Sequence, residues 1–279
     1  MNSFQELLDY MAFPETTLLD KPLYKRMFLE HASLDAADKK ALKETIDKIR
    51  WIYTLKPSTI NIAAYSDDQY DYSEIAVLHV ETHSVKQYER IGEFINRAIP
   101  YPLVVLMSTT VGNREYVNLC LADKRQSKSD KDKQVIEELY FSGWIELAVS
   151  YPGQSNQGQS NQKQSEPEQT EQESPNQDFL ASLKVSALPF TDFRRFYQAM
   201  IDRVVALNWA AKTGNFVLLT SQERSLEKRK ALKQYHELEL KIQKLRKELK
   251  QSAFNRQVEL NATIKKYQQE LKRLEQSLS

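Results

Sequence analysis

The spacing of apolar residues predicts three helices before residue 221 of the chain. Residues 35–55 have apolar side chains three or four positions apart, and Pro57 would end a helix there. Residues 85–99 repeat this spacing. Residues 190–212 are apolar over most of a helix circumference, which predicts a buried helix that ends near Gly214.

Alternating or continuous apolar runs predict the strands of one sheet. Residues 74–80 are typical of a strand, and the run PLVVLM at 102–107 is apolar enough to be covered on both faces. A turn sequence at 111–114, followed by alternation at 115–121, predicts a β-hairpin. Further strands are predicted at 58–62, 140–149 and 179–188. The expected fold class is α+β or α/β, with a small mixed sheet of about four or five strands and packing helices.

Residues 152–177 consist mostly of Gln, Ser, Asn, Glu and Pro, and the sequence GQSNQ occurs twice in succession. Such a segment buries too little apolar surface to offset the entropy lost on ordering, so we predict a disordered insertion in a surface loop. The predicted organisation is an N-terminal part of the body at 1–151, the insertion at 152–177, the remainder of the body at 178–220 and a long C-terminal helix at 221–279.

Residues 221–279 contain no Gly or Pro and are dominated by strong helix formers. Apolar residues recur there every three to four positions, which is the pattern of a coiled-coil seam. The seam consists of Leu238, Ile242, Leu245, Leu249, Leu260, Ile264, Leu271, Leu274 and Leu278. We therefore predict a C-terminal coiled-coil helix that mediates association.

The seam shifts by one residue in the stretch QSAFNRQVELN at 251–261. A straight helix of this length would reach roughly 85 Å, too long to bury its seam on the body. Either two chains pair, or the helix folds back at the shift as an antiparallel hairpin. The lack of Gly and Pro favours a continuous or gently bent helix. The residues beside the shift, which could dock a partner or pack on the body, are Phe254, Asn255, Arg256, Val258 and Glu259.

Charge is uneven along the chain. The whole sequence has a formal charge of +1, but residues 221–279 carry fifteen Lys or Arg against eight Glu. The basic residues that could follow a phosphate backbone are Lys228, Arg229, Lys230, Lys241, Lys244, Arg246, Lys247 and Lys250. The simpler interpretation is that they form the solvated faces of the coiled coil, so nucleic-acid binding is an alternative prediction.

Composition excludes several kinds of site. Cys120 is the only cysteine, which rules out an internal disulfide and a cysteine-based zinc cluster. The sequence has no glycine-rich phosphate-binding motif, and we predict no nucleotide hydrolysis, no cofactor and no metal. Its apolar runs are far shorter than a membrane span, so we predict a cytoplasmic protein without a membrane partner.

One grouping has the order of acidic and basic residues found in restriction-like nucleases. Asp71 and Glu81 could hold a divalent cation, and His83 stands where a residue that positions the water is needed. Short spacing matches of this kind also arise because a strand end beside a loop is commonly polar. A metal-dependent nuclease subunit is therefore an alternative to a protein without catalytic residues.

Several fragments resemble one protein family. DKPLYKRMF, IRWIYTLKPSTINI, EIAVLHVET with INRAIPYPLVVLM, and SAFNRQVELN before IKKYQQELKRL are similar to sequences of the domain-of-unknown-function 4391 family. The resemblance implies a small bacterial or archaeal protein often encoded beside helicases, restriction-type enzymes and DNA methyltransferases, a setting that suggests anti-phage defence. It implies no catalytic residue.

We therefore expect a non-catalytic assembly or adaptor protein, an accessory component of an anti-phage defence or restriction-type DNA-processing system. The C-terminal coiled coil would associate with a second copy of the chain or with a larger partner of the helicase or methyltransferase type. The alternatives are the nuclease subunit and a DNA-binding accessory that uses the basic tail.

Overall fold

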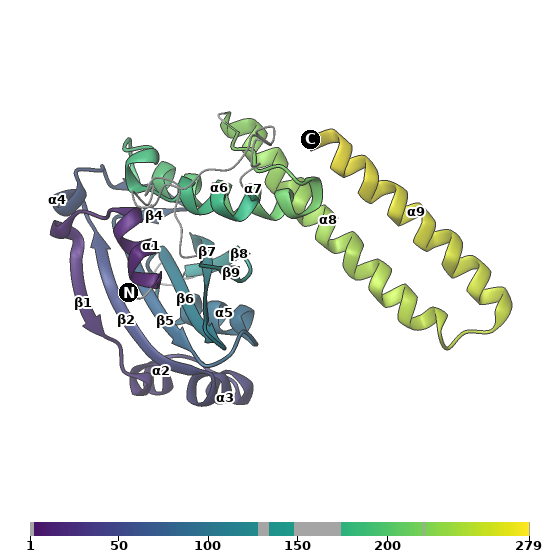
Figure 1. Cartoon of the computed structure of the whole chain (residues 1–279), viewed down its shortest axis with the longest axis horizontal. Helices are drawn as coiled ribbons and strands as arrows, with labels where there is room; N and C mark the ends of the chain where they lie inside the picture. The colour runs from purple at the N-terminus through teal and green to yellow at the C-terminus, as the bar shows by residue number, and fades with distance from the viewer. Residues whose placement is uncertain (1–2, 128–133, 148–173, 220, 279) are drawn as a thin grey trace, which may run out of the picture. The chain divides into compact units, whose positions relative to one another are not determined.

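The computed structural model describes residues 3–127, 134–147, 174–219 and 221–278 (Figure 1). The chain divides into two compact units, Met1–Val204 and Val205–Ser279. Within the described residues, the first unit contains a mixed sheet with helices on both faces, and the second contains helices that pack together.

Among the described residues, seven strands form one sheet with the order β1-β2-β5-β6-β7-β8, and β9 pairs with β7 (Figure 1). β5 and β6 are parallel, and the other neighbours are antiparallel. The strands are β1 (Leu18–Pro22), β2 (Ile46–Leu55), β5 (Ile75–Thr82), β6 (Leu103–Val111), β7 (Arg114–Gln126), β8 (Gln134–Phe141) and β9 (Ile145–Glu146); β3 (Tyr65–Ser66) and β4 (Asp71–Tyr72) form a separate ribbon. The sequence predicts too few strands because β1 is exposed along its length and leaves no periodic pattern, and because β2 lies within a predicted helix.

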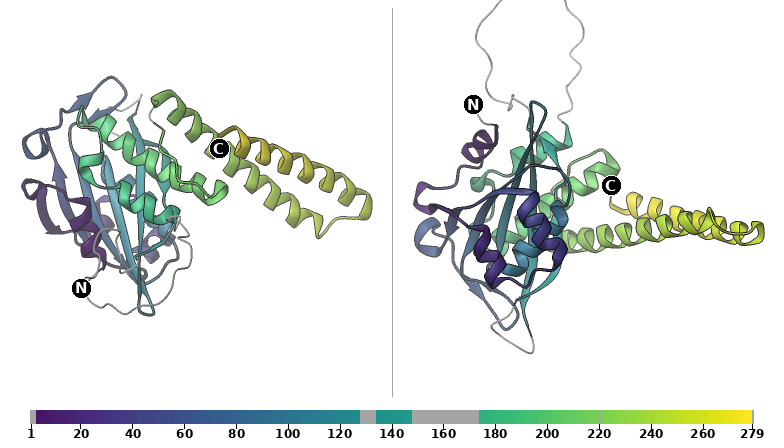
Figure 2. Two further views of the ribbon diagram at one scale, coloured as in Figure 1. Left: turned by 45° about the horizontal axis from the view of Figure 1, so that its top comes forward. Right: turned by 90° about the horizontal axis from the view of Figure 1, so that it is seen from below.

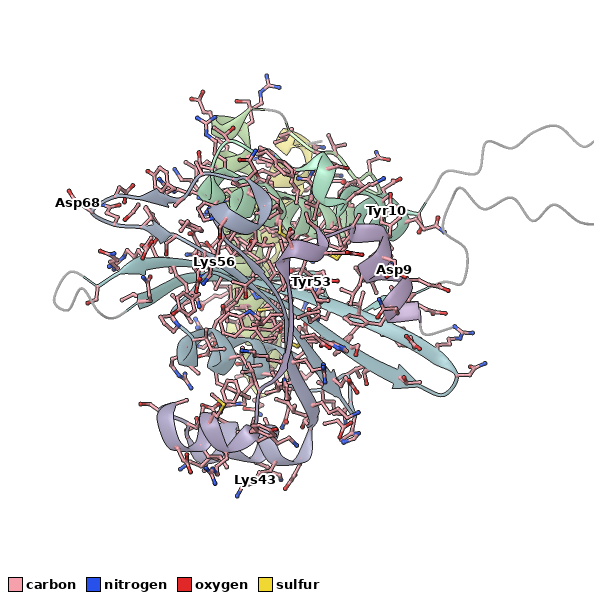
Figure 3. All side chains as sticks on the ribbon, turned by 90° about the vertical axis from the view of Figure 1, so that its left-hand side faces the viewer. Asp9, Tyr10, Lys43, Tyr53, Lys56 and Asp68 are labelled. Carbon is pink, nitrogen blue, oxygen red and sulfur yellow. The ribbon has the colours of Figure 1, made fainter. Side chains whose placement is uncertain are left out.

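Helices cover both faces of the sheet (Figure 2). One face carries α2 (Lys25–His31), α3 (Ala36–Glu44) and α5 (Tyr88–Ala98), and the other carries α1 (Ser3–Met11), α6 (Pro175–Ser182) and the first half of α7 (Phe193–Thr213). Figure 3, which views the β1 side, shows Lys43 on α3 and both Asp9 and Tyr10 on α1, on opposite sides of the sheet.

The best-patterned elements are confirmed. β5, β6 and α5 lie where the sequence predicts them, and β6 joins β7 in a hairpin that pairs Val111 with Arg114. The predicted buried helix is α7, which ends before Gly214 at φ 85°. Its Tyr197 hydroxyl accepts the N–H of Ala122 (2.9 Å) and donates to the carbonyl of Leu103 (2.7 Å), so α7 is bonded to the middle of the sheet.

The helix predicted at 35–55 is correct only in its first half. α3 ends at Glu44, and residues 46–55 form β2, hydrogen-bonded to β1 on one side and β5 on the other. Four apolar side chains of β2 are buried at a spacing of three: Ile46, Ile49, Ile52 and Leu55. Two irregularities in the pairing with β5 break the usual alternation of two. The resulting spacing is indistinguishable from that of a helix in the sequence.

Two further strand predictions are wrong because a proline begins a helix there. Residues 57–60 form α4 (Pro57–Ile60), in which Thr59 Oγ1 accepts the N–H of Lys56 (2.9 Å). Residues 175–182 form α6, followed by a 3-10 turn at Val185–Ala187. Proline suits the first turn of a helix, where its missing N–H has no partner to lose. The strand predicted at 140–149 is divided between the end of β8 and β9.

The predicted disordered insertion lies mostly outside the described residues. Residues 152–173 belong to the part that the structure does not describe. Residues 174–177 are described, and they cap and begin α6 rather than continue an insertion, because Gln177 Oε1 accepts the N–H of Ser174 (3.3 Å).

The second unit consists of the end of α7 with α8 (Gln222–Leu249) and α9 (Phe254–Leu278). Trp209 of α7 donates from Nε1 to the carbonyl of Lys228 (3.1 Å), and its ring meets that of Tyr235 edge-on at 5.7 Å. Lys212 Nζ lies 3.0 Å from Glu239 Oε1. α7 and α8 therefore pack together through a hydrogen bond, an aromatic contact and an ion pair.

The prediction of one continuous C-terminal helix is wrong, and the fold-back that the sequence left open is present (Figure 1). α8 and α9 run antiparallel, with the Tyr235 hydroxyl donating to Glu275 Oε1 (2.8 Å). The turn at 250–253 forms without Gly because side chains bond its carbonyls. Ser252 Oγ donates to the Glu248 carbonyl (2.8 Å), and Gln257 Nε2 donates to the Ser252 carbonyl (2.8 Å).

α5 approaches the sheet closely at Gly92. A Cβ on this residue would lie 2.6 Å from Cε1 of Phe141 and 2.7 Å from Sγ of Cys120. Gly92→Ala is therefore expected to lower the free energy of unfolding by about 2 kcal/mol through overpacking, despite the better helix propensity of alanine. Urea denaturation checks this, with the exposed Glu89→Ala of the same helix as the control; equal midpoints for the two variants would contradict it.

Candidate functional site

A polar pocket of about 340 Å³ opens at the carboxyl ends of the parallel strands β5 and β6. Open α/β sheets bind ligands beyond the carboxyl ends of their strands, which makes this position a candidate site. Five ionisable side chains line it. Asp47 comes from β2, His79 and Glu81 from β5, His83 from the residue after β5, and Glu115 from β7. The lining also includes Phe4 of α1 and two residues of β6 with hydroxyl groups, Ser108 and Thr110.

His79 and Ser108 are hydrogen-bonded across the two parallel strands. The register pairs Ser108 with Glu81, so both residues face the same side of the sheet as His79. His79 Nε2 lies 2.7 Å from Ser108 Oγ, and His79 Nδ1 lies 4.0 Å from Glu81 Oε1. A carboxylate only accepts hydrogen bonds, so Glu81 favours the proton on Nδ1, and Nε2 then accepts the hydroxyl of Ser108.

The surroundings of His79 keep its ring neutral and fixed. Burial lowers the pKa of His79 to about 4, and the positive charges of Arg50 and Lys48 on β2 act in the same direction. The Phe4 ring stacks on the imidazole with centroids 3.8 Å apart and planes inclined by 15°. Glu115 Oε2 accepts the N–H of Phe4 (3.0 Å), which fastens the start of α1 over the pocket.

Charged side chains form the rim. Lys48 Nζ lies 3.4 Å from Glu81 Oε2 and 3.7 Å from Asp47 Oδ2. The exposed His83 places its Nε2 3.7 Å from Asp47 Oδ1. Glu81 and His83, both predicted as site residues, therefore share this pocket with Asp47.

Asp71, the third residue of the predicted nuclease grouping, lies elsewhere. It belongs to β4, where its Oδ1 accepts the N–H of Ser73 (3.0 Å), and it does not line the pocket. Asp71 precedes β5, whereas Glu81 lies near the end of β5, and the strand residues between them span roughly 23 Å. Figure 3 shows Asp68 of the same ribbon far from Asp9 and Tyr10 on α1, the helix that covers the pocket. Among the described residues, no three His, Cys, Asp or Glu side chains come together as a metal site would require.

The predicted seam is buried inside one chain. Leu238 and Ile242 of α8 and Leu260 and Ile264 of α9 are buried. Four further seam residues are half-buried: Leu245, Leu249, Leu271 and Leu274. The side chain of Leu278 lies outside the described residues. The antiparallel partner that the seam requires is therefore supplied by the same chain.

The residues predicted as a docking point lie at the tip of the hairpin, where α9 begins (Figure 1). Phe254 is 77% exposed and Val258 is 56% exposed. Asn255 is also exposed. Arg256 contacts both Glu248 Oε1 (3.0 Å) and Glu259 Oε2 (2.9 Å), so it braces the turn. The tip therefore presents two apolar side chains on a braced turn.

The basic residues of α8 divide into two groups. Lys228 is buried and donates from Nζ to the carbonyl of Val217 (3.1 Å), so it does not face solvent. Arg229 is half-buried. The remaining predicted phosphate contacts are exposed: Lys230, Lys241, Lys244, Arg246, Lys247 and Lys250. Five of these six lie in the last ten residues before the tip, which makes this end of the hairpin basic.

The family model described as Domain of unknown function (DUF4391) matches residues 11–271. The chain belongs to this family. The matched range of the DUF4391 chain includes the strands that form the pocket and the hairpin with its tip, and only Phe4 of the pocket residues named above precedes it. No curated protein and no solved structure matches the chain. Among its described helices, none has the length and apolar character needed to cross a membrane.

The sequence predicts two of the residues that line the pocket in this DUF4391 chain. Glu81 and His83 are recognised from their place after an apolar strand, and His79 is a packed, hydrogen-bonded histidine, as residues on a buried strand usually are. Ser108 is missed because it becomes a neighbour of His79 only through strand pairing. Glu115 is missed because it meets Phe4 only where α1 packs on the sheet. One signal for Ser108 is present in the sequence: a strand, a helix and a strand in succession favour parallel pairing, which places the carboxyl ends of the two strands side by side.

Proposed function

We propose that this DUF4391 chain is an assembly or adaptor protein that docks onto a larger protein through the tip of the α8–α9 hairpin. The exposure of Phe254 carries the proposal: it is 77% exposed on a turn between two helices whose own seam is buried. Exposed apolar side chains that cluster are typical of interaction sites, and aromatic residues are frequent anchors of interfaces.

In this proposal α8 and α9 form a short antiparallel coiled coil that presents the tip. Leu238 and Ile242 already have partners within the chain, so association through the seam would first have to separate the two helices. A different protein is therefore a better partner for the tip than a second copy paired through the seam. Docking of this kind requires no catalytic residue in the DUF4391 chain.

Charge suggests the kind of surface that receives the tip. Lys247 and Lys250 are exposed just before the turn, while Arg256 is occupied by Glu248 and Glu259. An apolar pocket with an acidic rim would complement Phe254 and these lysines. The family setting supports a cytoplasmic partner of the helicase or methyltransferase type in an anti-phage defence or restriction-type DNA-processing system.

Phe254→Asp is expected to weaken binding to such a partner about 100-fold, because it places a charge where an aromatic anchor enters a pocket. The measurement is titration of the full chain against a helicase and a methyltransferase of the kind often encoded beside members of this family. The matched control is Leu240→Asp, which changes a side chain that is 52% exposed on α8 but not at the tip. The proposal fails if neither of these two proteins binds, or if both variants bind like the unchanged chain.

The same proteins test the alternatives. Retention on DNA that falls steeply with salt and is lost in Lys247→Glu, with Phe254→Asp unaffected, would support the DNA-binding accessory instead. Magnesium-dependent DNA cleavage that is lost in Glu81→Ala would support the nuclease subunit, which now rests on Glu81 and His83 without Asp71.

A further inference from the structure

A second feature, separate from the hairpin, is the contact between Ser108 and His79. Many serine–histidine contacts inside proteins only satisfy two polar groups. This one differs because both side chains line a pocket of about 340 Å³. The Nε2 to Oγ distance of 2.7 Å is that of a hydrogen bond, and Glu81 lies on the far side of the ring, 4.0 Å from Nδ1. A nucleophile, a base and an acidic residue behind the base recur in enzymes that form an acyl intermediate, and the distances are often looser without substrate.

The positions of these groups are fixed from several sides. Phe4 covers one face of the imidazole, and Ser108 is held by the β5–β6 pairing. Lys48 Nζ lies 3.4 Å from Glu81 Oε2, while the other oxygen of this carboxylate faces the ring. The serine oxygen is thus presented to the pocket by a rigid sheet, which is the support that a reactive side chain needs.

We propose that Ser108 is a nucleophile activated by His79, and that the pocket accepts small acyl esters or thioesters without negative charge. Ser108 Oγ forms a bond to the carbonyl carbon while its proton moves to His79 Nε2. The bond from that carbon to the alcohol or thiol then breaks, and the leaving group takes the proton from Nε2. Water, deprotonated by the same nitrogen, then attacks the acyl carbon. The bond from that carbon to Ser108 Oγ breaks, the acid is released, and Oγ takes the proton back from Nε2. Glu81 is a positioning residue that acts through the ring.

The lining determines the class of substrate. Asp47, Glu81 and Glu115 place three carboxylates around the pocket, which disfavours anionic substrates. The volume admits a small acyl group rather than a polymer. The hydroxyl of Thr110 on the same strand is a candidate donor to the oxygen that becomes negative during attack.

A fluorophosphonate probe tests the proposal without knowledge of the substrate. Its phosphorus bonds to an activated serine and releases fluoride, and the labelled residue of the full folded chain is identified by mass spectrometry. Label is expected on Ser108 and is lost in Ser108→Ala. His79→Gln is expected to slow labelling by about 100-fold or more, the range of a lost general base. Glu81→Gln should slow it less, and Glu81→Asp should restore part of the rate.

Two controls separate chemistry from misfolding. Ser84→Ala changes a serine just beyond β5 that lacks the imidazole contact, and it is expected to leave labelling unchanged. Ser108→Cys should react with iodoacetamide faster when His79 is present than in the Ser108→Cys, His79→Gln double variant, with both folded by circular dichroism. The proposal is overturned if Ser108 is labelled no faster than Ser84, or if His79→Gln labels at the unchanged rate. Neither result bears on the docking of the hairpin.

Discussion

Lys124→Met is expected to remove the rise in stability that Lys124 causes between about pH 7 and pH 9, a change of roughly 2 kcal/mol. Lys124 is buried on β7, and its Nζ donates to the carbonyls of Ile99 and Tyr101, both at 2.8 Å. Burial lowers the pKa of Lys124 from its ordinary 10.5 to about 7, with Cys120 acting weakly in the other direction.

The sign follows from proton binding. Between about pH 7 and pH 10.5 the unfolded chain keeps the lysine proton and the folded chain releases it, so stability increases with pH in this window and is lowest below it. Denaturation in urea at pH 7, 8 and 9 measures the slope for both chains. Lys124→Met also changes the absolute free energy of unfolding, because the carbonyls of Ile99 and Tyr101 lose a donor. The test is therefore the slope of stability against pH and not its value at one pH. The exposed Lys43→Met is the control, and parallel curves for the unchanged chain and Lys124→Met would refute the prediction.

Asp38→Ala is expected to lower the free energy of unfolding by about 3 kcal/mol, because it removes a buried carboxylate that joins two helices. Asp38 on α3 is bonded to Arg90 Nη1 (2.7 Å) and Arg97 Nη2 (2.5 Å) of α5. The same carboxylate accepts the N–H of Asp35 in the capping box that begins α3. The change therefore removes one of the two hydrogen bonds of the capping box together with the ion pairs between α3 and α5.

A matched surface pair shows whether burial is the cause. Glu30 and Arg26 form an exposed ion pair on α2, 3.2 Å apart, and Glu30→Ala is expected to cost less than about 0.5 kcal/mol. Thermal and urea denaturation of the two variants give the comparison. If Asp38→Ala and Glu30→Ala shifted the midpoint equally, the interpretation of Asp38 as a buried link would be wrong.

The sequence predicts elements well where one period dominates. β6 is a continuous apolar run and α5 has a clean helical face, and both are found. β2 is not predicted as a strand, because irregular pairing with β5 gives its buried residues a spacing of three. The turn between α8 and α9 is also not predictable from the sequence. Side chains of Ser252 and Gln257 bond the carbonyls there, so the turn lacks the glycine that usually marks a helix end.

The candidate site is predictable only in part for a related reason. Glu81 and His83 follow an apolar strand and attract notice in the sequence, whereas Ser108 is one hydroxyl among many until strand pairing sets it beside His79. Asp71 is close to Glu81 in the sequence and far from it in the fold, because an entire strand lies between them. Residues separated by a strand are carried apart, and residues separated by a crossover are brought together.

The position of Tyr197 late in the chain determines when the central sheet receives its covering helix during synthesis. The residue follows Leu103 and Ala122 by 94 and 75 positions, so the central strands leave the ribosome well before the helix that covers them. At about 5–20 residues per second, the part of the sheet that α7 covers stays open for several seconds. The nascent chain is then most exposed to aggregation, and it is over this interval that a chaperone would be needed.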